Sequence, residues 1–251
     1  MKFLTKHDWE NKIKLFFNKN SLKETYEEKL FFEMSQLIKD LTARKKFDHI
    51  SYGIAMTFFH YYACFNELRN FDKLEVGFAC LYMSSKIQFY KFSLNEFIDD
   101  YKNYIKNTPG PEKKNPDFIK YETQLYSQLG YDLDIETPFH FFYKEFFAKT
   151  NFNKEQMEKL KHFCFNLIND TYSRPLCIYY HPKIIYLSCI IFSLKFLDYN
   201  DFDINKLIEN ENKELIAECM EQIYQIYSRY IENDTNKNNS NNNNNNTDIK
   251  K

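Results

Sequence analysis

Residues 77–87 read GFACLYMSSKI, and residues 186–196 read YLSCIIFSLKF. The two stretches begin 109 residues apart, and a cysteine, a serine and a lysine recur at the same places in both. Drawn as helices, both are apolar on nearly every side up to the closing lysine. A helix that is apolar all round is buried among other elements. We therefore expect two central helices, each enclosed by further helices.

The separation of the two copies indicates a duplicated domain. A repeat of roughly 100 residues is too long for a solenoid unit and has the size of a small domain. The sequence thus predicts an all-α protein with two tandem five-helix bundles. We place an N-terminal segment at residues 1–22, the first bundle at 23–133, the second at 134–232, and an asparagine-rich tail at 233–251. The tail is so poor in apolar residues that we expect it to be disordered.

Composition narrows the possible functions. The chain of 251 residues has only four glycines, which argues against a glycine-rich phosphate-binding loop and hence against nucleotide chemistry. Its 34 basic and 35 acidic residues leave no strong field for nucleic acid or an anionic membrane. Six isolated cysteines on apolar stretches are typical of a reduced, intracellular protein. We expect no cofactor, metal or small-molecule substrate, and no signal peptide or membrane span.

Hydrophobic periodicity predicts five helices in each bundle. In the first bundle they cover residues 24–43, 49–65, 72–87, 93–106 and 117–129. In the second they cover residues 138–148, 154–173, 182–197, 203–209 and 211–230. Asp72 and Ser93 are predicted N-caps, because each has a short side-chain acceptor before an apolar run. Gly130 is predicted to end a helix in a left-handed conformation, and Pro138 to begin the next helix.

The order of several short strings resembles the cyclin fold. These strings are FDKLEVGFACL (residues 71–81) with Ser85-Lys86, YETQL (121–125), LGYDL (129–133) and TPF (137–139). In the second half, NDTYS (169–173), LCIYY (176–180) and Pro182 resemble the transcription-class cyclins of the T, K and L groups more than the cell-cycle cyclins. The resemblance extends over residues 9–230, nearly everything outside the tail.

This resemblance implies a regulatory subunit that is not itself an enzyme. Cyclins form a heterodimer with a cyclin-dependent Ser/Thr kinase, press on its αC helix and activation loop, and so complete its ion pair and metal site. The likeness to the T, K and L groups implies a role in regulation of RNA polymerase II transcription. It also implies a nuclear location, with a cytoplasmic pool left open.

The resemblance also implies which residues contact the kinase. In the family, the lysine that ends the third helix and the glutamate of the fifth hydrogen-bond the kinase backbone beside αC, and these are Lys86 and Glu122 here. Apolar positions carried over from the same surface are Met83, Ile87, Tyr126, Tyr131 and Leu133. The chain departs from the family just after Lys86: many cyclins have one hydrophobic residue and two acids there, whereas this chain has Ile87-Gln88-Phe89.

Each of these positions also has an ordinary structural explanation. A lysine in the last turn of a helix is stabilised by the macrodipole without any partner, which is the role we expect for Lys195. Taken alone, Glu122 is typical of a solvated acid near a helix start, and Tyr126 and Tyr131 of core residues. The pairs His162/Cys164 and Cys177/His181 match no common zinc spacing, and we expect ordinary packing roles for them. Asp99-Asp100 is expected to solvate a helix end.

Two alternative functions remain open. A general transcription factor core can use the same duplicated helical fold, but it should carry a basic face and usually a preceding zinc ribbon. Neither feature is visible, since the lysines are scattered among acids and no cysteine precedes Cys64. A kinase-independent scaffold with a cyclin fold is the other alternative, and the Gln88-Phe89 departure keeps it open.

Overall fold

The computed structural model describes residues 24–66, 72–106, 116–145, 152–199, 203–209 and 211–228. Within these ranges every regular element is a helix, as predicted. The first bundle contains α2 (Glu24–Arg44), α3 (His49–Phe65), α4 (Lys73–Ile87), α5 (Leu94–Lys106) and α6 (Phe118–Gln128). The second contains α7 (Pro138–Glu145), α8 (Lys154–Thr171), α9 (Leu176–Tyr179), α10 (Pro182–Phe196), α11 (Ile204–Leu207) and a last helix over residues 213–228. The predicted N-terminal segment and disordered tail lie outside the described residues.

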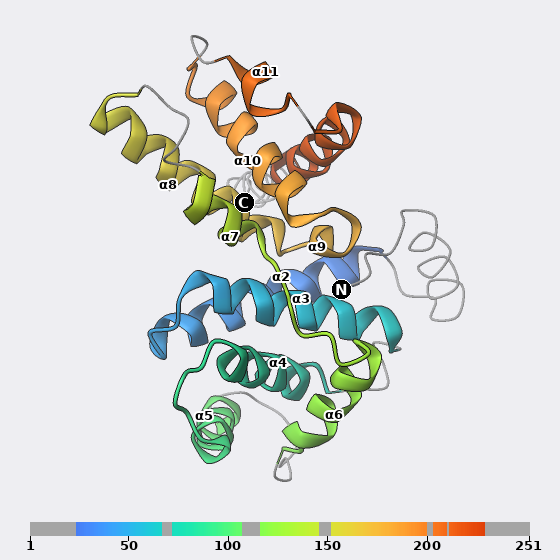
Figure 1. Cartoon of the computed structure of the whole chain (residues 1–251). Coiled ribbons are helices and arrows are strands. Elements are labelled where there is room, and N and C mark those ends of the chain that lie inside the picture. The colour runs from blue at the N-terminus through green and yellow to red at the C-terminus, as the bar shows by residue number, and fades with distance from the viewer. Residues whose placement is uncertain are drawn as a thin grey trace, which may run out of the picture.

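The two repeated helices are the central helices of the bundles, as the sequence predicts. Helix α4 packs against α2, α3, α5 and α6, and α10 packs against α7, α8 and α9 (Figure 1). The recurring cysteines, Cys80 and Cys189, are fully buried at equivalent places. The recurring serines, Ser84 and Ser193, are also buried, and each hydroxyl donates to a backbone carbonyl, so neither is left without a partner.

Helix α3 joins the two bundles. It packs against α2, α4 and α6 of the first bundle and also against α7 and α9 of the second (Figure 1). The Tyr52 hydroxyl donates to the Asn169 carbonyl at 3.3 Å, and its ring meets that of Tyr172 edge-on at 5.4 Å. Gly53 is required here, since a Cβ would lie 2.8 Å from the Tyr172 hydroxyl and 3.0 Å from Thr137 Cγ2. The bundles therefore share a buried contact as well as a linker.

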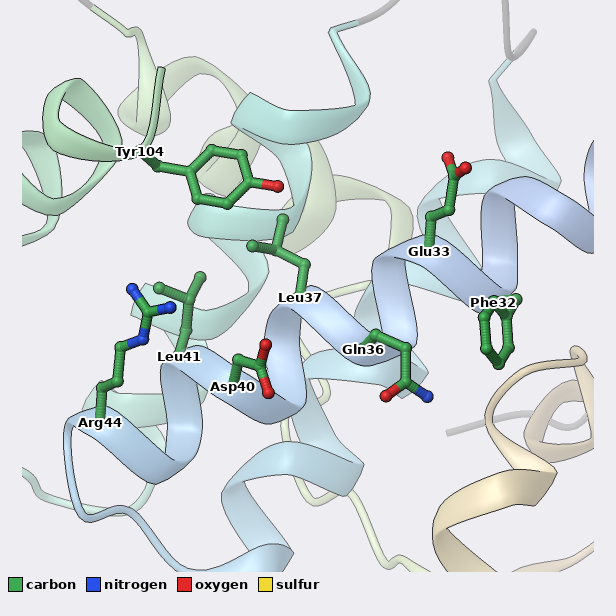
Figure 2. Close-up of a pocket in the computed structure, with 8 residues that line it drawn as sticks. All are labelled: Phe32, Glu33, Gln36, Leu37, Asp40, Leu41, Arg44 and Tyr104. Atoms are coloured by element: carbon green, nitrogen blue, oxygen red, sulfur yellow. The ribbon is translucent and has the colours of Figure 1, made fainter. Parts of the chain in front are cut away.

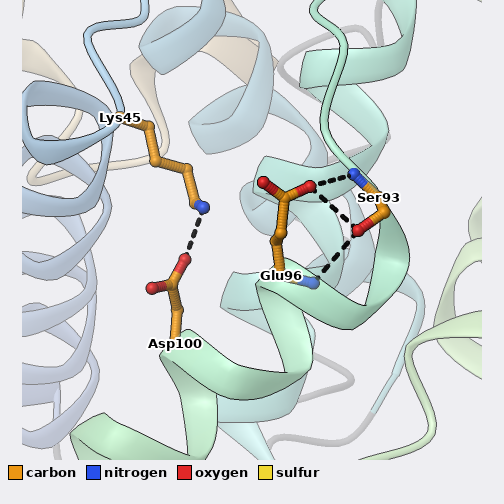
Figure 3. Close-up of polar contacts among 4 residues, drawn as sticks. All are labelled: Lys45, Ser93, Glu96 and Asp100. Atoms are coloured by element: carbon orange, nitrogen blue, oxygen red, sulfur yellow. Dashed lines mark hydrogen bonds and ion pairs between the residues drawn. The ribbon is translucent and has the colours of Figure 1, made fainter.

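Local signals in the sequence fix several helix starts. The Asp72 carboxylate accepts the amide N–H groups of Leu74 and Glu75 at the start of α4, which confirms it as an N-cap. At the start of α5 the Ser93 amide donates to the Glu96 carboxylate at 2.6 Å, and the Glu96 amide donates to the Ser93 hydroxyl at 3.3 Å (Figure 3). This reciprocal pairing is a capping box, and it satisfies two amides that no carbonyl within the helix could reach.

Four helices end in the same left-handed turn. The residue at this turn is Lys46 after α2, Phe89 after α4, Gly130 after α6 and Asp198 after α10, with φ between 55° and 63°. In each case its amide and the following one donate back to carbonyls of the last helical turn, the Schellman arrangement. The turn at Gly130 confirms the prediction.

Candidate partner-binding surface

Lys86 and Glu122 come together on one surface of the first bundle. Lys86 lies in the last turn of α4, and Glu122 lies on α6, which packs against α4. The Lys86 ammonium donates to the Glu122 carboxylate in a short ion pair. The Lys86 side chain is 43% exposed and that of Glu122 only 7%, so the carboxylate is nearly buried while the lysine stays partly open to solvent. Glu122 is therefore a buried, paired acid, and the description of a solvated acid is wrong.

The surroundings of Lys86 keep its side chain charged and oriented. Partial burial acts to lower the pKa of Lys86, but the hydrogen bond and the charge of Glu122 outweigh this, so the net effect raises the pKa. The ammonium also lies 5.1 Å from the centre of the Tyr82 ring, one helical turn earlier on α4. A cation over an aromatic face is attracted by the ring quadrupole. Tyr82 was missed at the sequence level, although its spacing of four residues from Lys86 places both on one helix face.

Three of the predicted apolar positions, Tyr126, Tyr131 and Leu133, lie on α6 or shortly after its end at Gln128. The rings of Tyr126 and Tyr131 stack almost parallel, with centroids 6.5 Å apart and an interplanar angle of 8°. Tyr131 is 76% exposed, whereas Tyr126 and Leu133 are half-buried. Ile87, beside Lys86, is half-buried as well. We call Lys86, Ile87, Glu122, Tyr126, Tyr131 and Leu133 together the Lys86 surface.

Met83 does not belong to this surface. Its side chain is fully buried in the core of the first bundle. The resemblance to cyclins implied that Met83 packs against a partner. This prediction is wrong, because the Met83 side chain is not accessible at the surface. Met83 lies three residues before Lys86, so both are on one face of α4. The burial of Met83 therefore comes from the core side chains packed over it and not from its position on the helix.

Phe89 lies at the point where the sequence departs from the cyclin pattern. Its side chain is 90% exposed, the largest value among the exposed large apolar residues of the described chain. Its backbone is fixed: the Phe89 amide donates to the Lys86 carbonyl at 3.1 Å, and the Tyr90 amide donates to the Ser85 carbonyl at 2.9 Å. The sequence showed the departure, but it gave no sign that Phe89 would point into solvent.

The equivalent surface of the second bundle is different. Lys195 is exposed in the last turn of α10, and no ion pair is found for it among the described residues. Phe196, which corresponds to Ile87, stacks on Phe163 with ring centroids 4.4 Å apart. The two lysines thus share a position in the repeat and have different surroundings.

The histidines and cysteines considered as metal ligands have structural roles. His162 is hydrogen-bonded to Asn166 on the exposed side of α8, and His181 caps α10 by accepting the Lys183 amide. Cys164 and Cys177 are buried. Among the described residues, no group of three or more His, Cys, Asp or Glu side chains could hold a metal ion.

A second region of interest lies between α2 and α5. An open hollow of about 370 Å³ is lined by Phe32, Glu33, Gln36, Leu37, Asp40, Leu41, Arg44 and Tyr104 (Figure 2). Tyr104 of α5 faces Leu37 and Leu41 of α2, and half of the lining side chains are charged or carry an amide. Small-molecule pockets are mostly apolar and enclosed, so this hollow does not fit such a site.

Next to this hollow, Lys45 forms an ion pair with Asp100 (Figure 3). The Lys45 side chain is only 10% exposed, and its ammonium lies 4.3 Å from the centre of the Phe97 ring and 4.8 Å from that of Phe92. The pair ties the end of α2 to α5. Asp100 therefore has a structural partner, which corrects the expectation that it only solvates a helix end.

Curated proteins of similar sequence are cyclins. The chain is 20% identical to Cyclin-K of Danio rerio over 157 residues, which cover 61% of this chain and 36% of the relative. It is 20% identical to Cyclin-K of Homo sapiens, over 61% of this chain and 27% of the relative. It is 25% identical to Cyclin-T1-5 of Arabidopsis thaliana over 186 residues, or 70% of this chain and 31% of the relative. The chain is similar to transcription-class cyclins. The match spans about a third of these relatives, and no family model matches the chain.

Solved structures share the fold of this cyclin-like chain. A chain of the yeast RNA Pol II CTD kinase CTDK-1 complex matches with a TM-score of 0.71 at 15% identity, over 90% of this chain and 73% of the other. A chain of the yeast TFIIK (Kin28/Ccl1/Tfb3) complex gives 0.65 at 17%, over 89% and 96%. A chain of the CAK complex of Chaetomium thermophilum gives 0.62 at 13%, over 81% and 65%. Among the described helices, none is long and apolar enough to cross a membrane.

Proposed function

We propose that this chain is a regulatory subunit that binds a cyclin-dependent Ser/Thr kinase and activates it, in regulation of RNA polymerase II transcription. The similarity to Cyclin-K and Cyclin-T1-5, and the shared fold with chains of three kinase complexes, support this proposal. The proposal also includes a nuclear location and a boundary between the two bundles at residues 133 and 134. The chain itself transfers no phosphate; activation comes from moving the αC helix of the kinase into place.

The Lys86–Glu122 ion pair is the observation that carries the proposal. A lysine ammonium has three donors, and Glu122 uses one of them, so the partly exposed ammonium of Lys86 can still donate to backbone carbonyls of a kinase. Glu122 is nearly buried, and we assign it the role of holding Lys86 in place before the partner arrives. Around them, Ile87, Tyr126, Tyr131 and Leu133 would pack against the kinase helix.

The duplication supplies a matched control for this role. If Lys86 acts only within the chain, through the helix dipole and its pair with Glu122, Lys86→Ala should lower the free energy of unfolding but leave kinase affinity unchanged. Lys195→Ala, which removes only a dipole contribution, should cost about 0.3 to 1 kcal/mol of stability. In the proposed role, Lys86→Ala weakens kinase binding by about 2 kcal/mol or more, because it leaves backbone acceptors unpaired at the interface. Lys195→Ala leaves the kinase affinity unchanged. Titration calorimetry with the kinase that co-purifies with the tagged full chain measures both.

Glu122→Ala tests the pairing itself. If Glu122 and Lys86 act as a unit, Glu122→Ala weakens kinase binding in the same direction, and the double variant loses less than the sum of the two single losses. Equal kinase affinities for Lys86→Ala and Lys195→Ala would remove the residue-level support for the proposal.

Kinase activity separates the proposal from the scaffold alternative, which the Gln88-Phe89 departure keeps open. The purified complex should phosphorylate substrate orders of magnitude faster than the kinase alone. A complex that forms while its kinase stays at the basal rate would show that the activating role is wrong, and it would favour the scaffold alternative.

A further inference from the structure

Phe89 combines two unfavourable features. A left-handed backbone is disfavoured for a bulky L-residue, and Phe89 adopts one with φ of 57°. Its aromatic ring is 90% exposed, so the side chain gains little packing in return. Lys46 and Asp198 adopt the same left-handed turn, so the backbone alone does not distinguish Phe89. What distinguishes Phe89 is the combination of this turn with an aromatic ring left in solvent.

The second most exposed large apolar residue of the described chain belongs to the Lys86 surface. Tyr131 is 76% exposed and also has a left-handed backbone, with φ of 62°. Its ring stacks on Tyr126, one turn beyond Glu122 on α6. Phe89 thus comes three residues after Lys86 at the end of α4, and Tyr131 comes just after α6, the helix that supplies Glu122. Both exposed aromatic residues therefore follow the helices that carry the Lys86–Glu122 pair.

The backbone around Phe89 is held in place from both sides. On one side its amide bonds to the Lys86 carbonyl. On the other, the Tyr90 ring packs on Phe47 with centroids 4.4 Å apart, and its hydroxyl accepts the Asp48 amide at 3.0 Å. Because the backbone at Phe89 is fixed, only its side-chain torsions lose freedom on binding, which lowers the entropic cost of using Phe89 as an anchor.

We propose that Phe89 is an aromatic anchor that determines which kinase this chain accepts, and that the accepted kinase has an apolar pocket opposite it. The inference rests on the function proposed above. Many cyclins have two acids at the positions that are Gln88 and Phe89 in this chain. A kinase that places a cationic side chain opposite these positions would therefore find no carboxylate to pair with. Burying that unpaired charge is costly, so such a kinase is rejected.

The test compares the same backbone position in the two bundles. Phe89→Gly and Asp198→Gly each relieve a left-handed turn, so both should raise the melting temperature of the free chain slightly. Only Phe89→Gly should weaken binding of the co-purified kinase, by about tenfold or more in titration calorimetry. Phe89→Leu should retain most of the affinity, and Phe89→Glu should bind at least as weakly as Phe89→Gly.

The outcomes separate this inference from the function on which it rests. Wild-type affinity in Phe89→Gly, or tighter binding by Phe89→Glu, would overturn the anchor while leaving the kinase-binding function intact. If the wild-type chain binds no cyclin-dependent kinase, the proposed function fails, and the anchor fails with it.

Discussion

At the scale of single residues, His60 shows how burial controls protonation. Its ring is fully buried on α3, and Nε2 lies 2.9 Å from the Tyr172 carbonyl. A carbonyl can only accept, so Nε2 carries the proton in the neutral ring, and Nδ1 has no partner among the described residues. Desolvation lowers the pKa of His60 from 6.5 to about 4, even though the hydrogen bond to Tyr172 acts to raise it.

This pKa predicts a loss of stability in mild acid. Because the pKa of the folded state lies below that of the unfolded state, the unfolded chain binds more protons between pH 6.5 and about 4. The His60 contribution is therefore complete above pH 6.5 and falls with pH, by about 2 kcal/mol between pH 7 and 5. Urea unfolding across this range measures it. His60→Gln should flatten the dependence, and an unchanged slope would show that other groups cause it.

The residues of the candidate site could be predicted only in part. The cyclin resemblance identified Lys86 and Glu122 as site residues. Their ion pair could not be predicted, because it depends on how α4 packs against α6, and the spacing of residues along the chain does not determine that packing. Met83 and Phe89 show the same limit. Their burial depends on the direction of a side chain relative to neighbouring helices, so one was wrongly assigned to the surface and the other was not recognised as part of it.

At the scale of helices, the Schellman ends show what periodicity can and cannot predict. Of the four left-handed positions, only Gly130 carried a sequence signal, because glycine adopts this conformation without steric cost. Lys46, Phe89 and Asp198 adopt it because the surrounding tertiary contacts require the chain to turn there. For the same reason helix ends were predicted to within a few residues, and the four-residue α9, too short to show a period, was missed.

Lys46 therefore offers a site where glycine should stabilise the protein. Lys46 is exposed, and its φ is 56°. Lys46→Gly removes the penalty of the left-handed backbone and should raise the free energy of unfolding by about 1 kcal/mol, measured by urea denaturation. Gly130→Ala is the inverse control: a Cβ there meets nothing within 4 Å, so its expected cost of about 1 kcal/mol arises from the backbone alone. If the free energy of unfolding rose in both variants, or fell in both, the left-handed backbone would not be the cause.

At the scale of the whole molecule, the contact made by α3 determines how the bundles behave together. Two bundles joined only by a linker would melt separately. Here the side chains of Tyr52 and His60 and the backbone of Gly53 on α3 pack against second-bundle residues, and all of the residues at this contact are buried. The second-bundle residues are Thr137, Asn169 and Tyr172. The sequence predicted two tandem bundles but not this buried contact between them, because the hydrophobic pattern within one repeat carries no information about what packs against the other repeat.

We therefore expect the wild-type chain to unfold in a single calorimetric transition, with equal calorimetric and van't Hoff enthalpies. Tyr52→Ala removes a ring and a hydroxyl from the contact between bundles, and it should split the transition in two. Tyr101→Ala is the matched control, because Tyr101 is equally buried but packs on Phe78 and Phe118 inside the first bundle. Both variants should lose about 3 kcal/mol or more. Only Tyr52→Ala should uncouple the bundles, and a single transition in that variant would show that contacts other than Tyr52 hold the bundles together.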